Sequence, residues 1–352
     1  MARAYNFAVV GLGMGGHHCK AIMNAKGAHL VAVCDHDPER LAHWSQACGC
    51  KGYSKWRDLL NDRDVKVVNI ATESGTHADF GIDAVKAGKH IIVEKPVDVA
   101  PARIDKLQTW VDKTGMKCGC IFQSRFENSN ILIKKAVDKG KMGRLIGVHA
   151  YLPWYRAQSY YEGPHGAWKG TWKLDGGGSL MNQGIHTVDL IQWLAGPVAS
   201  VCGFYGVFNH KIEAEDQTAA VLRFANGALG TLMTTTSAMP DKPQRVYMFG
   251  TKGSFSKVAD RLEFYEMDTP KERERMMRLF GGSAAPSDVG NDPMAVSTDG
   301  HTLIIEDMVR AIRHNREPAI SIDSARHSVE IACAIFESSR TGREVEVGKA
   351  RK

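Results

Sequence analysis

Short apolar runs alternate with longer amphipathic stretches through the first third of the chain. Each run has the length of a buried strand, and each stretch repeats its apolar positions at helical spacing. The runs are 7–10, 30–34, 67–70, 91–93 and 118–122, and the stretches between them include 17–24, 38–47, 78–87 and 102–114. This order predicts a parallel sheet with helices on both faces.

The rhythm changes after residue 122. A helix is predicted over 129–139 and a strand over 146–152, and longer strand-like segments follow at 198–208, 218–224, 229–236 and 246–249. Asn226-Gly227 is a strong hairpin signal, and Lys252-Gly253 marks another turn. Helices are predicted over 303–313 and 325–338, after a Gly- and Ser-rich stretch over 281–300 that is a connecting loop or a lid. This half is predicted to be a mainly antiparallel sheet with helices on one face.

A glycine turn precedes a segment with two neighbouring stripes. Gly176-Gly177-Gly178 cannot sit comfortably in a helix, so they mark a turn. Asn182, His186 and Asp189 then recur at spacings of four and three, beside an apolar stripe that includes Ile185. Two interpretations stay open here: a surface helix with its polar side in water, and a catalytic helix.

A second glycine turn predicts a dinucleotide site. Gly11, Gly13 and Gly16 form G-x-G-x-x-G around Met14, directly after the first strand and at the start of the first helix. Such a turn lets the backbone approach a pyrophosphate at the positive end of the helix. Asp35 ends the second strand, where a carboxylate accepts hydrogen bonds from a ribose and repels the extra phosphate of NADP. No Arg follows Asp35 directly, which favours NAD, with NADP as the alternative.

Lys95 follows the strand at 91–93 and precedes Pro96. Ligands of open α/β sheets bind outside the carboxyl ends of the strands, so Lys95 is a candidate site residue. Pro96 restricts Lys95 to an extended conformation. The alternative is an ordinary surface lysine.

Aromatic residues are dense just before the glycine triplet. Trp154, Arg156, Tyr161 and Trp172 are candidates for a substrate-binding wall, because aromatic faces suit the C–H faces of sugars. Arg156 can hold a carboxylate or phosphate with its forked guanidinium group. Packing within the domain is the alternative for each.

Composition narrows the function classes. The 352 residues are 43% hydrophobic and 24% charged, and the net charge of +6 is spread along the chain, which does not favour nucleic-acid binding. No apolar run is long enough to cross a bilayer, and the start of the chain leaves no room for a signal peptide unless one was removed. The eight cysteines form no C-x-x-C pair, which favours reduced thiols in the cytoplasm and predicts no metal. His17 and His18 are adjacent on a helix and point in different directions.

These motifs closely resemble, in their order and over nearly the whole chain, the glucose–fructose oxidoreductase / inositol dehydrogenase / rhizopine-catabolism (Gfo/Idh/MocA) family. The motifs are the turn at Gly11, the strand-end Asp35, Glu94-Lys95-Pro96, and the glycine triplet followed by Asn182, Gly184, His186 and Asp189. The resemblance implies an N-terminal Rossmann domain over 1–124 and a C-terminal α+β substrate and oligomerisation domain over 125–352. It also implies homodimers or homotetramers that use the open face of the sheet.

The resemblance further assigns individual residues. Lys95 matches the family's catalytic lysine and His186 its catalytic histidine. The residues matched to segments around the cofactor and the active site are Thr72, His77, Glu94, Gln123 and Arg125. The sequence departs from the family at Glu73, where proline is common. It departs again at Asn182, where the inositol dehydrogenases often have Asp, and this weakly disfavours inositol as substrate.

The resulting hypothesis is an NAD-dependent dehydrogenase of a secondary alcohol in a sugar or sugar derivative. His186 is the expected base, Lys95 polarises the oxyanion or relays the proton, and Asn182 orients a substrate hydroxyl. Asp189 either holds the imidazole of His186 or pairs with a structural partner. A glycoside-cleaving enzyme that uses tightly bound NAD without net redox is the alternative, and a non-catalytic ligand sensor ranks last.

Overall fold

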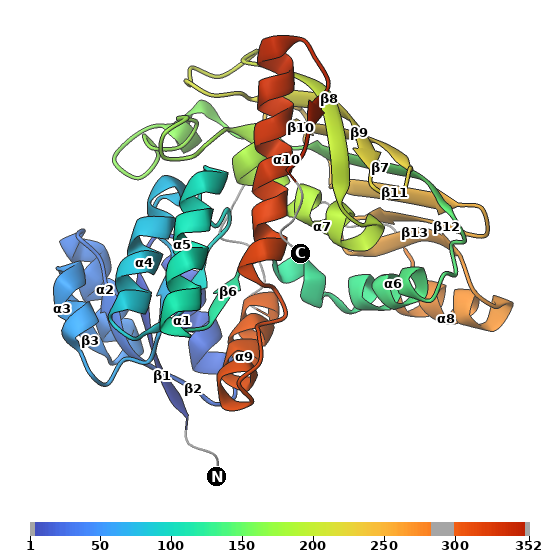
Figure 1. The fold of residues 1–352 in the computed structure, drawn as a ribbon. Coiled ribbons are helices and arrows are strands. Elements are labelled where there is room, and N and C mark those ends of the chain that lie inside the picture. Colours follow the sequence, from blue (N-terminus) through green and yellow to red (C-terminus); the bar gives the residue numbers. More distant parts are fainter. Residues whose placement is uncertain (1–3, 283–298, 349–352) are drawn as a thin grey trace. The chain divides into compact units, whose positions relative to one another are not determined.

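The computed structural model describes residues 4–282 and 299–348 (Figure 1). The described residues divide into two compact units. The first comprises residues up to Gln123 together with 299–326, and the second comprises 124–282 together with 327–348. The expected boundary at 124/125 lies close to this division, but the segment 299–326 groups with the N-terminal unit. Each unit is described separately below.

The first unit contains a six-stranded sheet in the order β3-β2-β1-β4-β5-β6. All the strand pairs are parallel, which confirms the prediction. The strands are β1 Tyr5–Val10, β2 Ala28–Cys34, β3 Lys51–Tyr53, β4 Val67–Ile70, β5 His90–Val93 and β6 Cys118–Cys120. The strand order reverses beside β1, and such a switch point is where doubly wound sheets bind their ligands.

Helices connect these strands. They are α1 Gly15–Asn24, α2 Pro38–Cys48, α3 Trp56–Asn61, α4 His77–Lys86, α5 Pro101–Thr114 and, from late in the chain, α9 Asp299–Arg313. Crossovers between parallel strands are right-handed, so the helices before and after the switch point lie on opposite faces. Helix α9 packs against α1 and buries an apolar stripe that includes Ile304 and Met308. This apolar contact explains why the segment joins the first unit.

The second unit contains an eight-stranded sheet in the order β13-β12-β11-β7-β10-β9-β8-β14. Its strands are β7 Leu145–Pro153, β8 Val198–Gly206, β9 Gln217–Phe224, β10 Leu229–Thr235, β11 Arg245–Gly250, β12 Ser254–Val258, β13 Arg261–Glu266 and β14 Val345–Glu346. Only β7 and β10 pair in parallel, so the predicted mainly antiparallel sheet is confirmed. Asn226-Gly227 turns between β9 and β10, with Gly227 at a φ of 86°.

The helices of the second unit include the one on which the site prediction rests. They are α6 Asn128–Asp138, η3 Gln158–Tyr161, η4 Ser179–Gly184, α7 Ile185–Ala195 and α8 Pro270–Phe280, with η2 Gln123–Phe126 and α10 Ile322–Thr341 crossing the division between units. Helix α7 packs against β7 (Figure 1). The predicted loop or lid over 281–300 lies mostly outside the described residues. Within the described ranges, no helix is both long and apolar enough to span a membrane.

Candidate functional site

The first glycine turn has the geometry that a dinucleotide requires. Gly11 has a φ of 83°, and a Cβ there would lie 2.5 Å from the carbonyl oxygen of Ala71. A Cβ on Gly16 would lie 2.2 Å from the indole of Trp44, so glycine lets α2 pack closely on α1. The missing side chains leave the backbone of the turn accessible at the start of α1, where phosphates bind. The turn therefore fits a pyrophosphate.

Asp35 fixes this turn to the end of β2. Its Oδ2 accepts the N–H of Leu12 at 2.6 Å, and its Oδ1 accepts the N–H of Asp37 at 2.9 Å. Each carboxylate oxygen has a second lone pair, which leaves acceptor capacity for ribose hydroxyls. Asp35 thus supports the turn and retains the chemistry expected for it.

The sequence prediction missed Arg40. This residue lies in the first turn of α2, and its guanidinium Nη1 lies 3.5 Å from the position of a Cβ on Gly13. It therefore places a positive charge beside the glycine turn. The prediction considered only the residues directly after Asp35, whereas Asp37 caps α2 and the helix carries Arg40 back to the turn.

The candidate cofactor residues after β4 and β5 are joined by His77. One ring nitrogen, Nδ1, lies 2.8 Å from the carbonyl oxygen of Pro96, and Nε2 lies 3.0 Å from that of Thr72. Thr72 also shares a hydrogen bond with Thr76 at 2.8 Å. The segment around Thr72 and the segment around Lys95 are thus tied together at the carboxyl ends of neighbouring strands.

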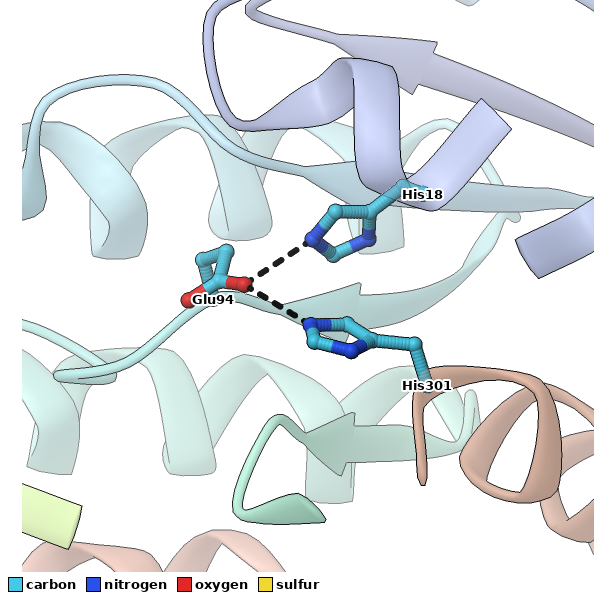
Figure 2. Close-up of side chains that lie close together, drawn as sticks. All are labelled: His18, Glu94 and His301. Carbon is cyan, nitrogen blue, oxygen red and sulfur yellow. Dashed lines mark hydrogen bonds and ion pairs between the residues drawn. The ribbon is translucent and has the colours of Figure 1, made fainter. Parts of the chain in front are cut away.

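Lys95 is half-buried, and the preceding side chain holds its backbone. The Lys95 N–H donates to Glu94 Oε2 at 2.8 Å. Glu94 Oε1 faces His18 Nε2 at 3.0 Å and His301 Nε2 at 3.5 Å (Figure 2). Burial raises the pKa of Glu94, but hydrogen bonds and charge from the two histidines outweigh it and bring this pKa well below its usual range. The Glu94 side chain is therefore engaged with the Lys95 backbone and with two buried histidines.

Gln123 lies at the end of the first unit, at the start of η2. A Cβ on Gly300 would lie 2.6 Å from Gln123 Cβ, so Gln123 packs closely on the first turn of α9. His17 and His18 are both buried in α1.

In the second unit, a buried carboxylate explains the glycine triplet. Glu215 accepts hydrogen bonds from the backbone N–H groups of Gly178, Ser179 and Leu180 at 2.9–3.0 Å. A Cβ on Gly178 would lie 2.0 Å from the Glu215 carbonyl oxygen, which only glycine avoids. Burial raises the pKa of Glu215 to about 7, against the opposing effect of these hydrogen bonds. No local pattern points to Glu215, because it lies about 40 residues after the triplet.

The predicted polar helix has two parts. Its first part, η4, is a π-helix whose residues are all buried, and α7 follows it. The interpretation as a surface helix with its polar side in water is therefore wrong. A π-turn adds residues to the helical repeat and is often found at functional sites.

Asn182 is held in one orientation within η4. Its Nδ2 donates to Asp175 Oδ1 at 2.7 Å, and its Oδ1 accepts from Gln183 at 3.2 Å. The other Asp175 oxygen accepts the N–H of Gly170 at 2.7 Å. A carboxylate at position 182 would face Asp175 as a like charge in a buried site. The neighbouring Asp175 thus gives a physical reason for Asn at this position.

His186 is half-buried on α7, and Asp189 one turn later is buried. Arg125 donates to the two Asp189 oxygens at 2.7 and 2.5 Å, and Ser328 donates at 3.2 Å. Burial raises the pKa of Asp189, while Arg125 opposes that rise. This forked ion pair is the structural partner that the sequence analysis left open for Asp189, and it occupies the Arg125 guanidinium group.

The aromatic candidates divide into two groups. The Arg156 guanidinium lies 5.2 Å from the ring centroid of Trp154 and donates to Gln183 at 3.0 Å, which connects it to Asn182. Tyr161 instead donates from its buried hydroxyl to Thr236 at 3.0 Å. Trp172 packs edge-to-face on Tyr205 and Phe336, with ring centroids 5.5 and 5.1 Å apart.

Each of the two groups of candidate residues lies within a single unit. The glycine turn, Asp35, Thr72, His77 and Lys95 gather at one edge of the first sheet, and the hydrogen bonds above link Asn182, Gln183 and Arg156 in the second unit. Lys95 and His186 lie in different units, so their convergence over one nicotinamide stays a prediction.

Two family models match the chain. Residues 5–122 match a family model described as an oxidoreductase family with an NAD-binding Rossmann fold, and residues 131–256 match the GFO/IDH/MocA C-terminal domain. The protein is thus an NAD-dependent oxidoreductase whose NAD-binding domain is followed by a second domain of this family. The chain belongs to the Gfo/Idh/MocA family, as its motifs predicted.

Three relatives illustrate the range of this similarity. The scyllo-inositol 2-dehydrogenase (NAD(+)) of Bacillus subtilis is 24% identical over 98% of this chain and 96% of its own. The levoglucosan dehydrogenase of Pseudarthrobacter phenanthrenivorans is 25% identical over 90% of this chain and 88% of its own. The structure of the WlbA dehydrogenase from Bordetella pertussis, in complex with NADH and UDP-GlcNAcA, is 29% identical and covers 99% of both chains with a TM-score of 0.89.

Proposed function

We propose that this enzyme transfers a hydride between a secondary alcohol of a sugar or sugar derivative and NAD. The observation that carries the proposal is the first unit, where a glycine turn fitted to a pyrophosphate and the Lys95 loop lie at the same edge of one parallel sheet. The relatives named above act on a cyclitol and a sugar derivative by their names, which supports this substrate class.

The roles proposed for this chain's residues follow from their chemistry. NAD, when bound, accepts the hydride. The backbone of the glycine turn and Arg40 hold the phosphates, and Asp35 accepts the ribose hydroxyls. Further cofactor contacts are proposed for Met14, Thr72, His77 and Gln123.

Three residues are proposed to act on the alcohol. His186 takes the proton from the alcohol oxygen, because imidazole titrates near neutral pH. Lys95 stabilises the developing negative charge on that oxygen. Asn182, held by Asp175, presents a fixed amide to a neighbouring hydroxyl.

We further propose that the natural substrate carries an acidic group, as in a nucleotide-linked sugar acid. Arg156 supports this, because it is a buried cation beside Trp154 and close in the hydrogen-bond network to Asn182. The WlbA structure, which contains such a ligand, is 29% identical over nearly the full length. Charge recognition by guanidinium groups is strong and directional, so it would discriminate against neutral sugars.

The test is a panel of nucleotide sugars, sugar acids, neutral sugars, cyclitols and glycosides, each with NAD and with NADP. Formation of NADH with an acidic sugar supports the proposal in full. NADH with only neutral members keeps the reaction and rejects the acidic substrate. Release of an aglycone without NADH identifies the glycoside-cleaving reaction instead, and cofactor binding without any turnover identifies a sensor.

We also propose a cellular location and an oligomeric state for the enzyme. All eight cysteines lie in described residues and are present as thiols, which suits a cytoplasmic enzyme. The outer face of the second sheet bears exposed apolar side chains such as Phe204 and Val221, which suits a homodimer or homotetramer. No role with nucleic acid or membranes is proposed.

A further inference from the structure

Three residues from distant parts of the chain form a buried cluster in the first unit. His18 comes from α1, Glu94 follows β5, and His301 comes from α9 (Figure 2). All three are buried, and both imidazoles point at the same carboxylate oxygen, Oε1, through their Nε2 atoms. We call these three residues the histidine clamp.

The proton on His18 can be placed from its second contact. Asn69 is fully buried in β4, and its Nδ2 lies 2.9 Å from His18 Nδ1. An amide N–H can only donate, so His18 Nδ1 is the acceptor in this contact. The hydrogen of the neutral ring is then on Nε2 and points at Glu94 Oε1, 3.0 Å away. Asn69, a polar residue in an otherwise apolar central strand, thereby selects the tautomer that donates to Glu94.

His301 completes the clamp from the far end of the chain. It lies in the first turn of α9, which packs against α1, and its Nε2 lies 3.5 Å from Glu94 Oε1. Its ring also packs edge-to-face on that of His18, with centroids 5.4 Å apart. Helix α9 therefore contributes a second ring nitrogen facing the same oxygen, which holds the carboxylate from a second direction.

The second oxygen of Glu94 shows what the clamp controls. Glu94 Oε2 accepts the backbone N–H of the next residue, Lys95, at 2.8 Å. This contact constrains the ψ angle of Glu94, which sets the direction in which the chain enters Lys95. The next residue is held as well, since the Pro96 carbonyl oxygen contacts His77. A rotation of the Glu94 carboxylate would release the Lys95 backbone on one side.

We propose that His18 and His301 are positioning residues that fix Lys95 through Glu94. The inference rests on the role proposed for Lys95. A buried carboxylate needs donors to stay ionised and in place, and the two imidazoles supply them to Oε1. The clamp thus leaves Oε2 free to accept the Lys95 N–H and aligns the lysine before any substrate arrives.

Two histidines and a glutamate can also bind a transition metal, but the hydrogen-bond pattern favours a clamp without metal. His18 Nε2 carries its hydrogen toward Glu94, whereas a metal would require the lone pair of that nitrogen. Metal analysis of the purified protein is therefore part of the test. A stoichiometric metal ion that is lost in His301→Leu would overturn the proposal.

The direct test measures hydrogen exchange of the Lys95 amide, which needs no substrate. His18→Leu and His301→Leu remove one donor each, and exchange in the peptide over residues 94–97 should become about 10- to 100-fold faster, as for a lost hydrogen bond to a charged group. His301→Gln keeps a donor and should stay within about threefold of wild type. His29→Leu, at an exposed histidine of the same unit, is the matched control. Unchanged exchange in both Leu variants would overturn the proposal.

A second measurement separates positioning from general destabilisation. With the most active member of the substrate panel, His301→Leu should lower kcat by about 10-fold or more while the Kd for NAD changes by less than about 2-fold, and His301→Gln should restore kcat. Equal loss in His301→Leu and His301→Gln would contradict a donor role. If His18→Leu does not fold, Glu94→Gln provides the second variant, with faster Lys95 exchange expected from its weaker acceptor. If Lys95 amide exchange becomes faster as expected but kcat does not change, the clamp is supported and the catalytic role of Lys95 is rejected.

Discussion

At the level of single residues, a charged side chain that is held in a buried ion pair is already engaged with its partner. Arg125 was matched to a family segment and Asp189 was a possible partner of His186, yet the two residues form a buried forked pair with each other. Asn182 is held in one orientation by Asp175 and Gln183. The sequence pattern therefore gave candidate residues, while the structure shows which of them already have a buried partner.

The ion pair of Asp189 predicts a large loss of stability. Asp189→Asn leaves a buried guanidinium without its counter-charge, and we expect the free energy of unfolding to fall by about 3 kcal/mol. Asp138→Asn removes the exposed pair with Lys134 and should cost less than about 0.5 kcal/mol. Urea unfolding measures both, and equal effects would contradict the structural role assigned to Asp189.

The contact between Asn182 and Asp175 makes a second prediction. Asn182→Asp would place two carboxylates within hydrogen-bond distance, and we expect a loss of about 1–3 kcal/mol at neutral pH. The loss should shrink in mildly acidic buffer, where the pair shares a proton. Thermal unfolding across pH provides the measurement, and a loss independent of pH would argue against the like-charge explanation.

Among the elements, the glycine triplet and η4 are joined to Glu215 by hydrogen bonds. Three successive backbone N–H groups point at one buried carboxylate, which fixes where η4 begins and so where Asn182 and α7 lie. Gly178 is required because the Glu215 carbonyl oxygen occupies the space of a side chain there, and Gly176 has a φ of 73°.

Glu215 predicts how stability changes with pH. Its pKa rises on folding from the usual 4.5 to about 7, so the native state binds the extra proton between these values. Stability from this group is therefore full below about pH 4.5 and is lost as the pH rises through about 7, by about 3 kcal/mol in all. Glu215→Gln should remove this slope. The unfolding free energy of wild type and variant is measured across this pH range. If it changes with pH by the same amount in both, the pH dependence does not come from Glu215.

The elements also show how far the sequence could predict the fold. The parallel sheet, the turn at Asn226-Gly227 and helices α6, α9 and α10 follow from periodicity and turn residues alone. The short β3 and α3 and the polar helix α8 were missed because each has too few apolar positions to form a pattern. The π-helix was predicted as an ordinary helix, since nothing local distinguishes the two.

The candidate site was predictable to a similar extent. Gly11, Asp35 and Lys95 follow or end predicted strands, so the sequence around each of them is enough to recognise it as a candidate. Their supporting residues come from remote segments. Arg40 reaches the glycine turn through a helix cap, and Glu215 and His301 reach their partners only through tertiary packing. A single sequence carries no signal for such contacts.

At the scale of the whole molecule, one surface is expected to join subunits. The strand register places Phe204, Ala219, Met233 and Tyr151 in one row across the second sheet. Phe204 is 70% exposed, and Val221 on the neighbouring row is 53% exposed. Exposed apolar rows of this kind are costly in a monomer and typical of interfaces.

This surface makes an association prediction. Phe204→Glu should shift the protein towards the monomer, because a charge would be buried at the subunit interface. Met23→Glu, at an exposed apolar residue of α1, is the matched control and should leave the mass unchanged. Light scattering coupled to gel filtration measures both. A wild-type protein that is already monomeric would refute the proposed oligomer.

Lys95 is proposed to act in hydride exchange between NAD and a sugar alcohol. The most direct measurement is NADH formation by wild type and Lys95→Ala, with the best substrate of the panel and NAD held above its Kd. We predict NADH formation by the wild type and a loss of about 100-fold or more in the variant, with NAD binding nearly unchanged. Equal rates of NADH formation by the two proteins would contradict the account.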